Sequence, residues 1–349
     1  MKIFTLLIAV MTITSCSKLF MQPITGCKSD DELTVYCGFL NPEDLALTPD
    51  EKFLIVSEFG GMSPLVEVSP GKLSLFDLQD KMKLELSIIF GDNEWGSSNC
   101  SRDQNIPFGP HGIDLITRKD GRHQLAVVSH YPTESIEMFE LQYDENWVLE
   151  WKGCINIENQ YYFNDVSLDD DGNFYATHMF DSNYSMINLA WNVFAKSNTG
   201  FVVKWIKDNK FVKLEYTAGS FPNGIALDQE NNNLVVNYNF GDRTILFDMD
   251  NQKQIGIFEY NSPDNVIIKD EFVWVTNHDH SAISALRCSK KTNCTLPFSV
   301  NQISLENLSL INSYKFKNNN MGTGTVGLPH QGSLWIGSYR SDRLAEGRL

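Results

Sequence analysis

A pattern that recurs six times along the chain constrains its fold more than any other feature of the sequence. One copy is Phe163-Asn164-Asp165-Val166-Ser167-Leu168, which turns at Asp171-Gly172 into Phe174-Tyr175-Ala176-Thr177-His178. Alone, this copy predicts only a β-hairpin that a polar pair opens. The other copies begin at Pro42, Pro110, Pro222, Pro263 and Gly324.

The copies lie about 40–70 residues apart, a period typical of propeller blades. One or two further strand-like runs follow each copy, for example at residues 136–140 and 244–248, and four short strands make one blade. The most helix-like piece, residues 184–195, is short. A β-sandwich also alternates strands and turns, but it gives no reason for six similar units. The sequence therefore predicts an all-β fold, one six-bladed β-propeller over residues 37–349.

The first residues read as a targeting segment. Lys2 precedes a short apolar run at residues 3–13, and Ile13-Thr14-Ser15-Cys16 resembles a bacterial lipobox. We expect residues 1–16 to be a lipoprotein-type signal peptide, with membrane attachment only through a lipid on Cys16, and residues 17–36 to be a polar tether. The alternative is an ordinary secretory signal cleaved nearby. Either reading places the protein outside the cytoplasm, at the membrane or secreted.

The net charge limits the possible partners, and the cysteine count indicates possible disulfides. The formal net charge is −16, which argues against nucleic acid because phosphates require Lys and Arg. Setting Cys16 aside leaves six cysteines, an even number that suits up to three disulfides outside the cytoplasm. Cys288 and Cys294 close a small loop and are the first pair expected. Cys100 with Cys154 and Cys27 with Cys37 follow by elimination.

Aligned copies place polar residues at the mouth of the central channel, because the innermost strands of a propeller line that channel. The first aligned position holds Glu43, His111, Asn164, Asn223, Asp264 and Gly324. The second position holds Asp44, Gly112, Asp165, Gly224, Asn265 and Thr325.

A buried ring of such groups would be costly unless a ligand satisfied it. Calcium takes six to eight oxygen ligands in tolerant geometry, whereas magnesium requires a stricter octahedron and zinc prefers more His or Cys ligands. The residues predicted to form a calcium cage are Glu43, Asn164, Asn223, Asp264 and Asn265. Asn and Asp are also common turn residues before a strand, but five of them at equivalent repeat positions favour the cage.

The ordered set of motifs resembles the paraoxonase/arylesterase family, and more widely the gluconolactonase and strictosidine-synthase-like propellers. The match runs from about Cys37 to Ser338. Its motifs are Asn-Pro-Glu-Asp-Leu at 41–45, Phe-Gly-Pro-His-Gly-Ile at 108–113, Val-Val-Ser-His at 127–130, Asn-Asp-Val at 164–166, Phe-Pro-Asn-Gly-Ile at 221–225 and Asp-Asn-Val at 264–266.

The resemblance implies two calcium ions in the channel. The cage residues would hold the catalytic ion, and Asp44, Asp165 and the backbone carbonyl of Ile113 would hold a deeper structural one. The family's histidine dyad would fall on His111 and His130, and its further channel histidine on His278. The chain departs from the family's animal members because residues 340–349 contain no cysteine to pair with Cys37. The lip at residues 92–105 and the segment after His178 also differ.

These residues point to calcium-dependent hydrolysis of a small-molecule lactone or aryl ester, with His111 taking a proton from water and His130 behind it. The chain has no Gly-x-Ser-x-Gly or His-Glu-x-x-His motif, one of which a serine hydrolase or metallopeptidase would need. Two alternatives are a non-catalytic calcium-stabilised binding module and a gluconolactonase-type sugar lactonase that does not need the dyad. The oligomeric state is not predicted.

Overall fold

The computed structural model describes residues 23–61, 68–157, 160–207, 211–281, 284–285, 288 and 294–349. The predicted signal peptide, Cys16 and the start of the predicted tether lie outside the described residues. In the part of the chain that is described, no helix is long and apolar enough to cross a membrane.

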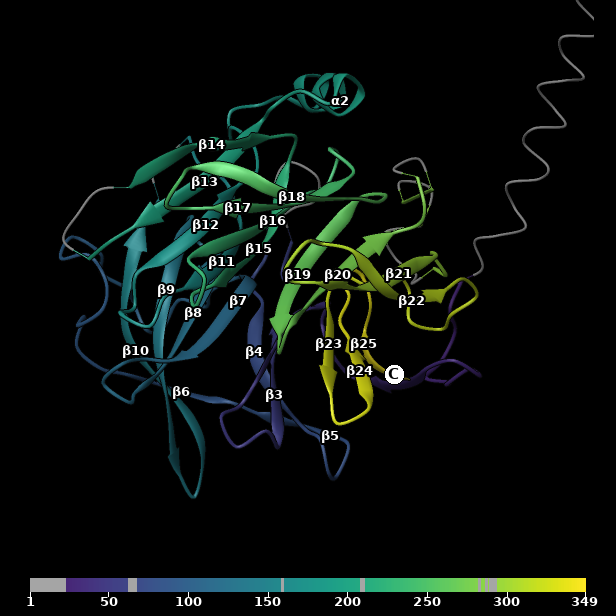
Figure 1. Cartoon of the computed structure of the whole chain (residues 1–349). Coiled ribbons are helices and arrows are strands. Elements are labelled where there is room, and N and C mark those ends of the chain that lie inside the picture. The colour runs from purple at the N-terminus through teal and green to yellow at the C-terminus, as the bar shows by residue number, and fades with distance from the viewer. Residues whose placement is uncertain are drawn as a thin grey trace, which may run out of the picture.

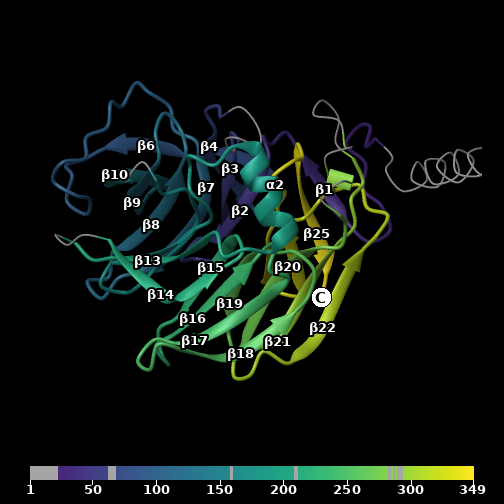
Figure 2. The same cartoon turned by 90° about the horizontal axis from the view of Figure 1, so that it is seen from above.

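Six small sheets follow one another around the molecule as the blades of a β-propeller, which confirms the predicted fold class (Figures 1 and 2). Blade 1 contains β2 (Pro42–Leu47), β3 (Phe53–Glu58), β4 (Lys72–Asp77) and β5 (Met82–Glu85). Blade 2 contains β7 (Pro110–Thr117), β8 (His123–Ser129), β9 (Ser135–Asp144), β10 (Asn146–Asn156) and, as a fifth strand parallel to β10, β6 (Ser87–Phe90). Blade 3 contains β11 (Phe163–Leu168), β12 (Phe174–His178), β13 (Gly200–Trp205) and β14 (Val212–Gly219).

The remaining three blades complete the ring. Blade 4 contains β15 (Pro222–Asp228), β16 (Asn233–Tyr238), β17 (Arg243–Asp248) and β18 (Lys253–Glu259). Blade 5 contains β19 (Pro263–Lys269), β20 (Phe272–His278), β21 (Phe298–Ser304) and β22 (Leu310–Phe316). Blade 6 contains β23 (Gly327–His330), β24 (Ser333–Ile336), β25 (Arg343–Arg348) and β1 (Thr34–Cys37).

The first and last described strands join in blade 6. Strand β1 pairs antiparallel with β25, with Thr34 opposite Glu346 and Cys37 opposite Arg343. This strand begins before residue 37, the predicted start of the propeller, and Leu33 just ahead of it is only 1% exposed. The described end of the predicted tether is therefore packed against the last blade.

Six apolar clusters fill the spaces between neighbouring blades. Between blades 1 and 2, for example, Ile55 and Leu75 pack with Val127 and Phe139. Equivalent clusters lie between each following pair, including blades 6 and 1. Full burial of one such side chain contributes about 1.5–3 kcal/mol, so the facing sheets stabilise each other and hold the inner strands around the channel.

The three expected disulfides are all present: Cys27–Cys37, Cys100–Cys154 and Cys288–Cys294. They fit a protein that folds in an oxidising compartment. Cys100–Cys154 ties the segment before β7 to β10, the neighbour of β6 in blade 2. Cys27–Cys37 takes the place of the C-terminal pairing that the family's animal members would suggest.

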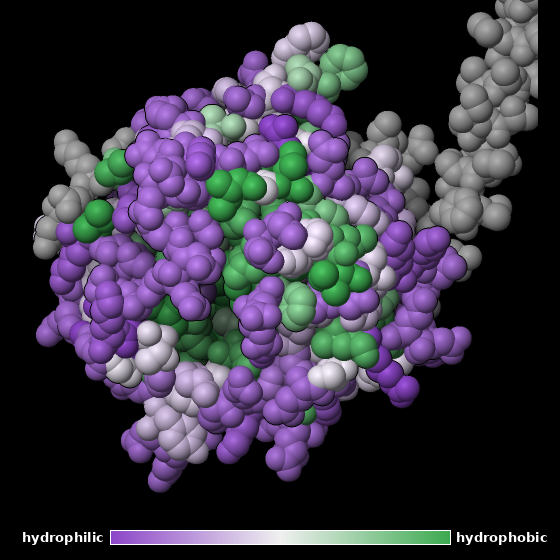
Figure 3. Space-filling view, viewed as in Figure 1, coloured by the Kyte–Doolittle hydropathy of each residue, from purple (hydrophilic) through white to green (hydrophobic). Residues whose placement is uncertain are grey.

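Helix α2 (Met186–Ala195) lies on one face of the propeller (Figures 1 and 2). Ser185 caps its N-terminus in a capping box with Asn188. Leu189 is its buried residue and packs in an aromatic cluster with Phe59 and Tyr162. The surface around this fold is mostly hydrophilic, with hydrophobic residues gathered where the face in Figure 3 is hollowed.

Candidate functional site

An irregularity in strand pairing sits at the polar pair of each of the first five blades. In β2–β3, for example, the pairing shifts between Pro42 and Asp44, around Glu43, and β7, β11, β15 and β19 shift at the matching place. Such bulges re-aim side chains and are common beside functional sites. The repeat therefore encodes both the residues and the backbone feature that turns them toward the channel.

The cage residues predicted from the sequence are buried, and polar contacts link several of them to one another and to their neighbours. Exposed fractions range from 2% to 6% for Glu43, Asn164, Asn223, Asp264 and Asn265. Asn265 Nδ2 donates to Glu43 Oε1 at 3.0 Å, and His278 Nε2 lies 3.1 Å from Asp264 Oδ2. Blade 6 contributes Thr325, whose hydroxyl donates to the Glu43 carbonyl at 2.6 Å.

Three oxygens of these residues have no hydrogen-bond donor among the described residues: Glu43 Oε2, Asn223 Oδ1 and Asn265 Oδ1. Leaving a buried polar atom unsatisfied costs about 1–3 kcal/mol. Carboxylate and amide oxygens are the donor set that calcium prefers in proteins. The residues present therefore fit a calcium ion, and the cost of the unpaired atoms gives a physical reason for one.

The charges at the site also favour a bound cation. The pKa of Glu43 lies well above its ordinary value, first because the carboxyl is buried and then because Asp44, Asp264 and Asp165 repel its charge. Without a counter-ion, these carboxylates oppose one another's ionisation. A bound divalent cation would reverse that effect.

Asp44 and Asp165, predicted for the deeper ion, also join neighbouring blades. Asp44 Oδ2 accepts the N–H of Ile113 at 2.8 Å, and Asp165 Oδ2 accepts the N–H of Ile225 at 2.9 Å. Burial raises the pKa of Asp44 to about 7 despite these bonds, and it raises the pKa of Asp165 strongly. The structure thus shows the N–H of Ile113 bonded to Asp44, whereas the Ile113 carbonyl stays a predicted ligand.

A cavity of about 350 Å³ continues the channel beyond Asp44 and Asp165. Its walls are mainly apolar residues that follow the site positions along the inner strands. Asp114, which sequence reasoning did not single out, also lines it and accepts the N–H of Leu168 at 2.7 Å. Burial raises the pKa of Asp114 to about 6.

The two histidines of the predicted dyad are in hydrogen-bond contact, with 3.0 Å between His111 Nδ1 and His130 Nε2. Phe59 stacks on the His111 ring at 4.4 Å, and Tyr162 stacks on the His130 ring at 4.7 Å. His111 Nε2 lies 3.7 Å from Glu43 Oε1, so the dyad borders the cage. Burial, and next the neighbouring His130, holds the pKa of His111 well below its ordinary value.

Two residues that contact the dyad were not predicted from the sequence as site residues. Glu134 lies four residues after His130 and bonds its Nδ1 atom. Tyr162, which stacks on His130, has its own N–H bonded to His178 Nδ1 at 3.1 Å, so His178 supports the wall beside the dyad. An acidic residue after a histidine in a turn was the available signal for Glu134, but many exposed turns share it.

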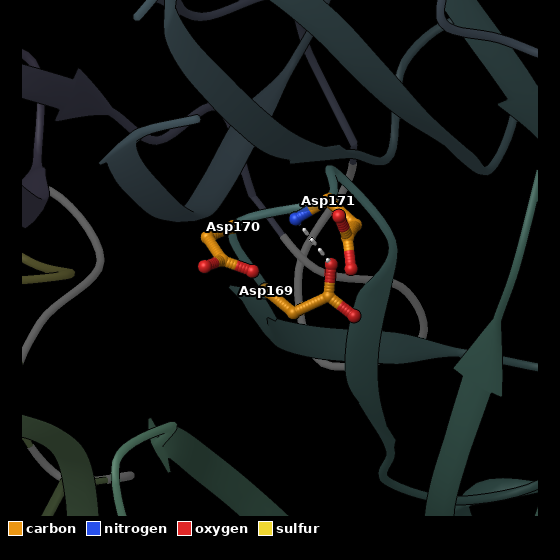
Figure 4. Close-up of side chains that lie close together, drawn as sticks. All are labelled: Asp169, Asp170 and Asp171. Atoms are coloured by element: carbon orange, nitrogen blue, oxygen red, sulfur yellow. Dashed lines mark hydrogen bonds between the residues drawn. The ribbon is translucent and has the colours of Figure 1, made fainter. Parts of the chain in front are cut away.

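The acidic run Asp169-Asp170-Asp171 lies in the turn between β11 and β12 (Figure 4). Lys119 Nζ is 2.9 Å from Asp170 Oδ1 and from Asp171 Oδ2. Asp169 instead accepts backbone N–H bonds within the turn, including that of Asp171. This run is a partly exposed, lysine-paired turn, and it stands apart from the channel-mouth residues.

Comparison with known proteins identifies one family and several similar folds. A family model described as Arylesterase matches residues 39–339. No curated protein sequence matches the chain. Among solved structures, a luciferin-regenerating enzyme superposes with a TM-score of 0.54 at 12% identity, covering 91% of this chain and 96% of that one. A gluconolactonase from Xanthomonas campestris superposes with a TM-score of 0.52 at 13% identity, covering 94% of each chain. Both structures share the fold with this chain.

Proposed function

Because the chain belongs to the arylesterase family, we propose that it is a calcium-dependent hydrolase of lactones or aryl esters. The observation that carries the proposal is the meeting of two features at one channel mouth. One is the set of buried oxygens on Glu43, Asn223 and Asn265 that find no donor in the described part of the chain. The other is a histidine, His111, that faces Glu43 and whose pKa is lowered by burial.

Two groups of residues would hold calcium. Glu43, Asn164, Asn223, Asp264 and Asn265 would hold one ion, and Asp44, Asp165 and the Ile113 carbonyl a second. When bound, the first ion would supply polarisation of the ester carbonyl and stabilisation of the negative charge that develops on its oxygen, effects often worth several kcal/mol. Asn265 and Thr325 hold Glu43 in place through its side chain and its carbonyl.

His111 is the proposed general base. Its lowered pKa keeps the imidazole neutral near pH 7, so it can accept a proton from water as the water oxygen bonds to the acyl carbon. The acyl carbon–oxygen bond then breaks, and the same proton passes to the leaving oxygen. The products are a carboxylic acid and an alcohol, which remain one molecule when the substrate is a lactone.

The aromatic residues at this mouth support a substrate with an apolar part. Phe59 and Tyr162 pack on the dyad, and Phe180 and Phe221 extend the same cluster toward α2. Apolar walls with a few convergent polar groups are typical of small-molecule sites.

The test is a panel of lactones and aryl esters with calcium present, run on the native chain, His111→Gln and His123→Gln. His123 is the first residue of β8, at the far end of that strand from His130, and bonds Thr117, so its variant is the matched control. We expect the wild type and the control to turn over a substrate, and His111→Gln to lose about 10²–10⁴-fold in kcat. No turnover across the panel would favour the binding-module alternative. Full activity of His111→Gln on sugar lactones would favour a gluconolactonase-type mechanism.

A further inference from the structure

Glu134 lies in the turn between β8 and β9, behind the histidine dyad. Its two carboxylate oxygens lie 2.8 and 2.9 Å from His130 Nδ1. The other nitrogen of His130, Nε2, lies 3.0 Å from His111 Nδ1. Glu134, His130 and His111 therefore form one continuous chain of hydrogen bonds that ends at His111 Nε2, which faces Glu43.

An ionised carboxylate would fix the direction of every bond in this chain. Such a carboxylate can only accept, so His130 Nδ1 would then carry a hydrogen. In a neutral imidazole the second nitrogen is then an acceptor, so His130 Nε2 accepts from His111 Nδ1. By the same rule, His111 Nε2 carries a lone pair.

We propose that Glu134 is a positioning residue that sets the tautomers of His130 and His111, so that the unprotonated nitrogen of the dyad faces the cage. This inference rests on the proposed hydrolase function for its kinetic consequence. Its structural content, the tautomer of each ring, concerns the resting protein alone. In a Ser-His-Asp triad a carboxylate holds the histidine in the tautomer that the reaction needs. Glu134 would have the same role here for a pair of histidines.

Because packing already fixes the orientation of both rings, the specific contribution of Glu134 is to select their tautomers. Phe59 and Tyr162 stack on the two imidazoles and fix their planes. The backbone N–H of His130 bonds to the Gly109 carbonyl at 3.0 Å, which fixes the position of the residue. Stacked rings and a main-chain bond do not distinguish Nδ1 from Nε2, whereas a carboxylate does.

The glutamate is also directed at this histidine. Within the described residues, His130 is the only basic side chain at ion-pair distance from Glu134. The side chain of Glu134 is 22% exposed and that of His130 is 1% exposed, so the pair links a buried ring to a partly hydrated acid. Hydrogen bonds to a charged group are stronger than neutral ones, and a low local dielectric strengthens the electrostatic attraction further.

The kinetic test compares Glu134→Gln, Glu134→Asp and the matched control Glu140→Gln in the purified protein with calcium present. Glu140 lies further along the same blade and faces Arg122 and Lys152. The amide of Glu134→Gln can donate to His130 Nδ1, which permits the opposite tautomers and protonates His111 Nε2. We expect kcat to fall at least ~10-fold with KM nearly unchanged, partial recovery in Glu134→Asp, and wild-type kinetics in the control.

The second readout is ¹⁵N NMR of histidine-labelled protein, with the two signals assigned from His111→Gln and His130→Gln. We expect Nδ1–H tautomers at both rings in the wild type and a shift toward Nε2–H in Glu134→Gln. Unchanged tautomers in Glu134→Gln, or a wild type with Nε2–H at His130, would overturn the inference whatever the kinetics. A wild type with the expected tautomers but no turnover on the panel would sustain the inference about Glu134 and overturn the proposed function instead.

Discussion

Gly112 of blade 2 packs directly against Asp165 of blade 3. A Cβ atom at position 112 would overlap Asp165 Oδ1 and would lie 2.7 Å from the Asn164 carbonyl oxygen and the Asp165 Cα. These neighbours are backbone atoms or a carboxylate held by Val166 and Ile225. The absence of a side chain at Gly112 is therefore what lets the Asn164–Asp165 pair reach the channel.

The first prediction concerns this contact. Gly112→Ala should lower the free energy of unfolding by about 1–3 kcal/mol, because overpacking against fixed neighbours forces backbone shifts. It should also reduce the stabilisation by calcium, since both displaced residues are predicted ligands. Thermal and urea unfolding with and without calcium measure the two effects.

Gly256→Ala is the matched control for that prediction. A Cβ at Gly256 would come no closer than 3.3 Å to Leu246 Cβ and Leu308 Cγ, so it would need shifts of only a few tenths of an ångström and should cost less stability than Gly112→Ala. A Gly112→Ala protein that unfolds like the wild type, with the same calcium response, would contradict the packing argument.

The second prediction concerns removal of the metal. Protein dialysed against EGTA and then into metal-free buffer should unfold at a lower temperature, and Ca²⁺ but not Mg²⁺ should restore it, because the donor oxygens suit the larger ion. At a calcium concentration 100 times the Kd, the gain should be about 2.7 kcal/mol. Differential scanning calorimetry measures it, and identical melting curves for the metal-free and calcium-loaded samples would count against both predicted ions.

The third prediction concerns pH. Burial raises the pKa of Asp44 to about 7, and the pKa values of Glu43 and Asp165 are raised as well. An unfolded Asp titrates near 3.9, so the metal-free folded protein binds more protons than the unfolded chain between about pH 4 and 7. Stability from these groups is therefore complete below about pH 4 and is lost as the pH rises through 7.

Calcium should remove that loss, because bound cations favour the ionised carboxylates. The difference in melting temperature between calcium-loaded and metal-free protein should thus grow from pH 5 to pH 8. A difference that stays constant or shrinks over this range would show that these carboxylates do not bind the ion.

The fourth prediction separates the channel cage from the acidic turn. Asn223→Leu keeps the size of the side chain but removes a buried oxygen that has no donor among the residues the structure describes, so it should weaken the calcium-dependent rise in melting temperature. Asp171→Asn changes a residue that pairs with Lys119 at the surface and should leave that rise unchanged. Isothermal titration of metal-free protein with Ca²⁺ measures both effects. A larger loss of Ca²⁺ binding in Asp171→Asn than in Asn223→Leu would indicate that the ion binds at the turn.

Particular residues mark where sequence reasoning succeeded. The recurring polar pair predicted the six blades, and the aligned first positions predicted that Glu43, Asn223 and Asp264 would lie near one another. The structure buries Glu43, Asn223 and Asp264 and places Asp264 close enough to Glu43 to raise its pKa. It also bonds His111 to His130, whereas the roles of these residues as calcium ligands and general base stay predictions. The pairing of Cys27 with Cys37 was reached only by elimination, yet the structure has it.

The sequence alone determined the repeat, because strand, turn and polar pair are local patterns whose period can be read along the chain. Only the tertiary structure decided that β1 pairs with β25 in blade 6 and that β6 adds a fifth strand to blade 2. It alone also decided which oxygens of Glu43 and Asn223 lack a donor within the described part of the chain. It also decided that Glu134 reaches His130. These features depend on distances between residues far apart in sequence, or on the shape of a single turn. Periodicity carries no information about either, since only packing fixes them.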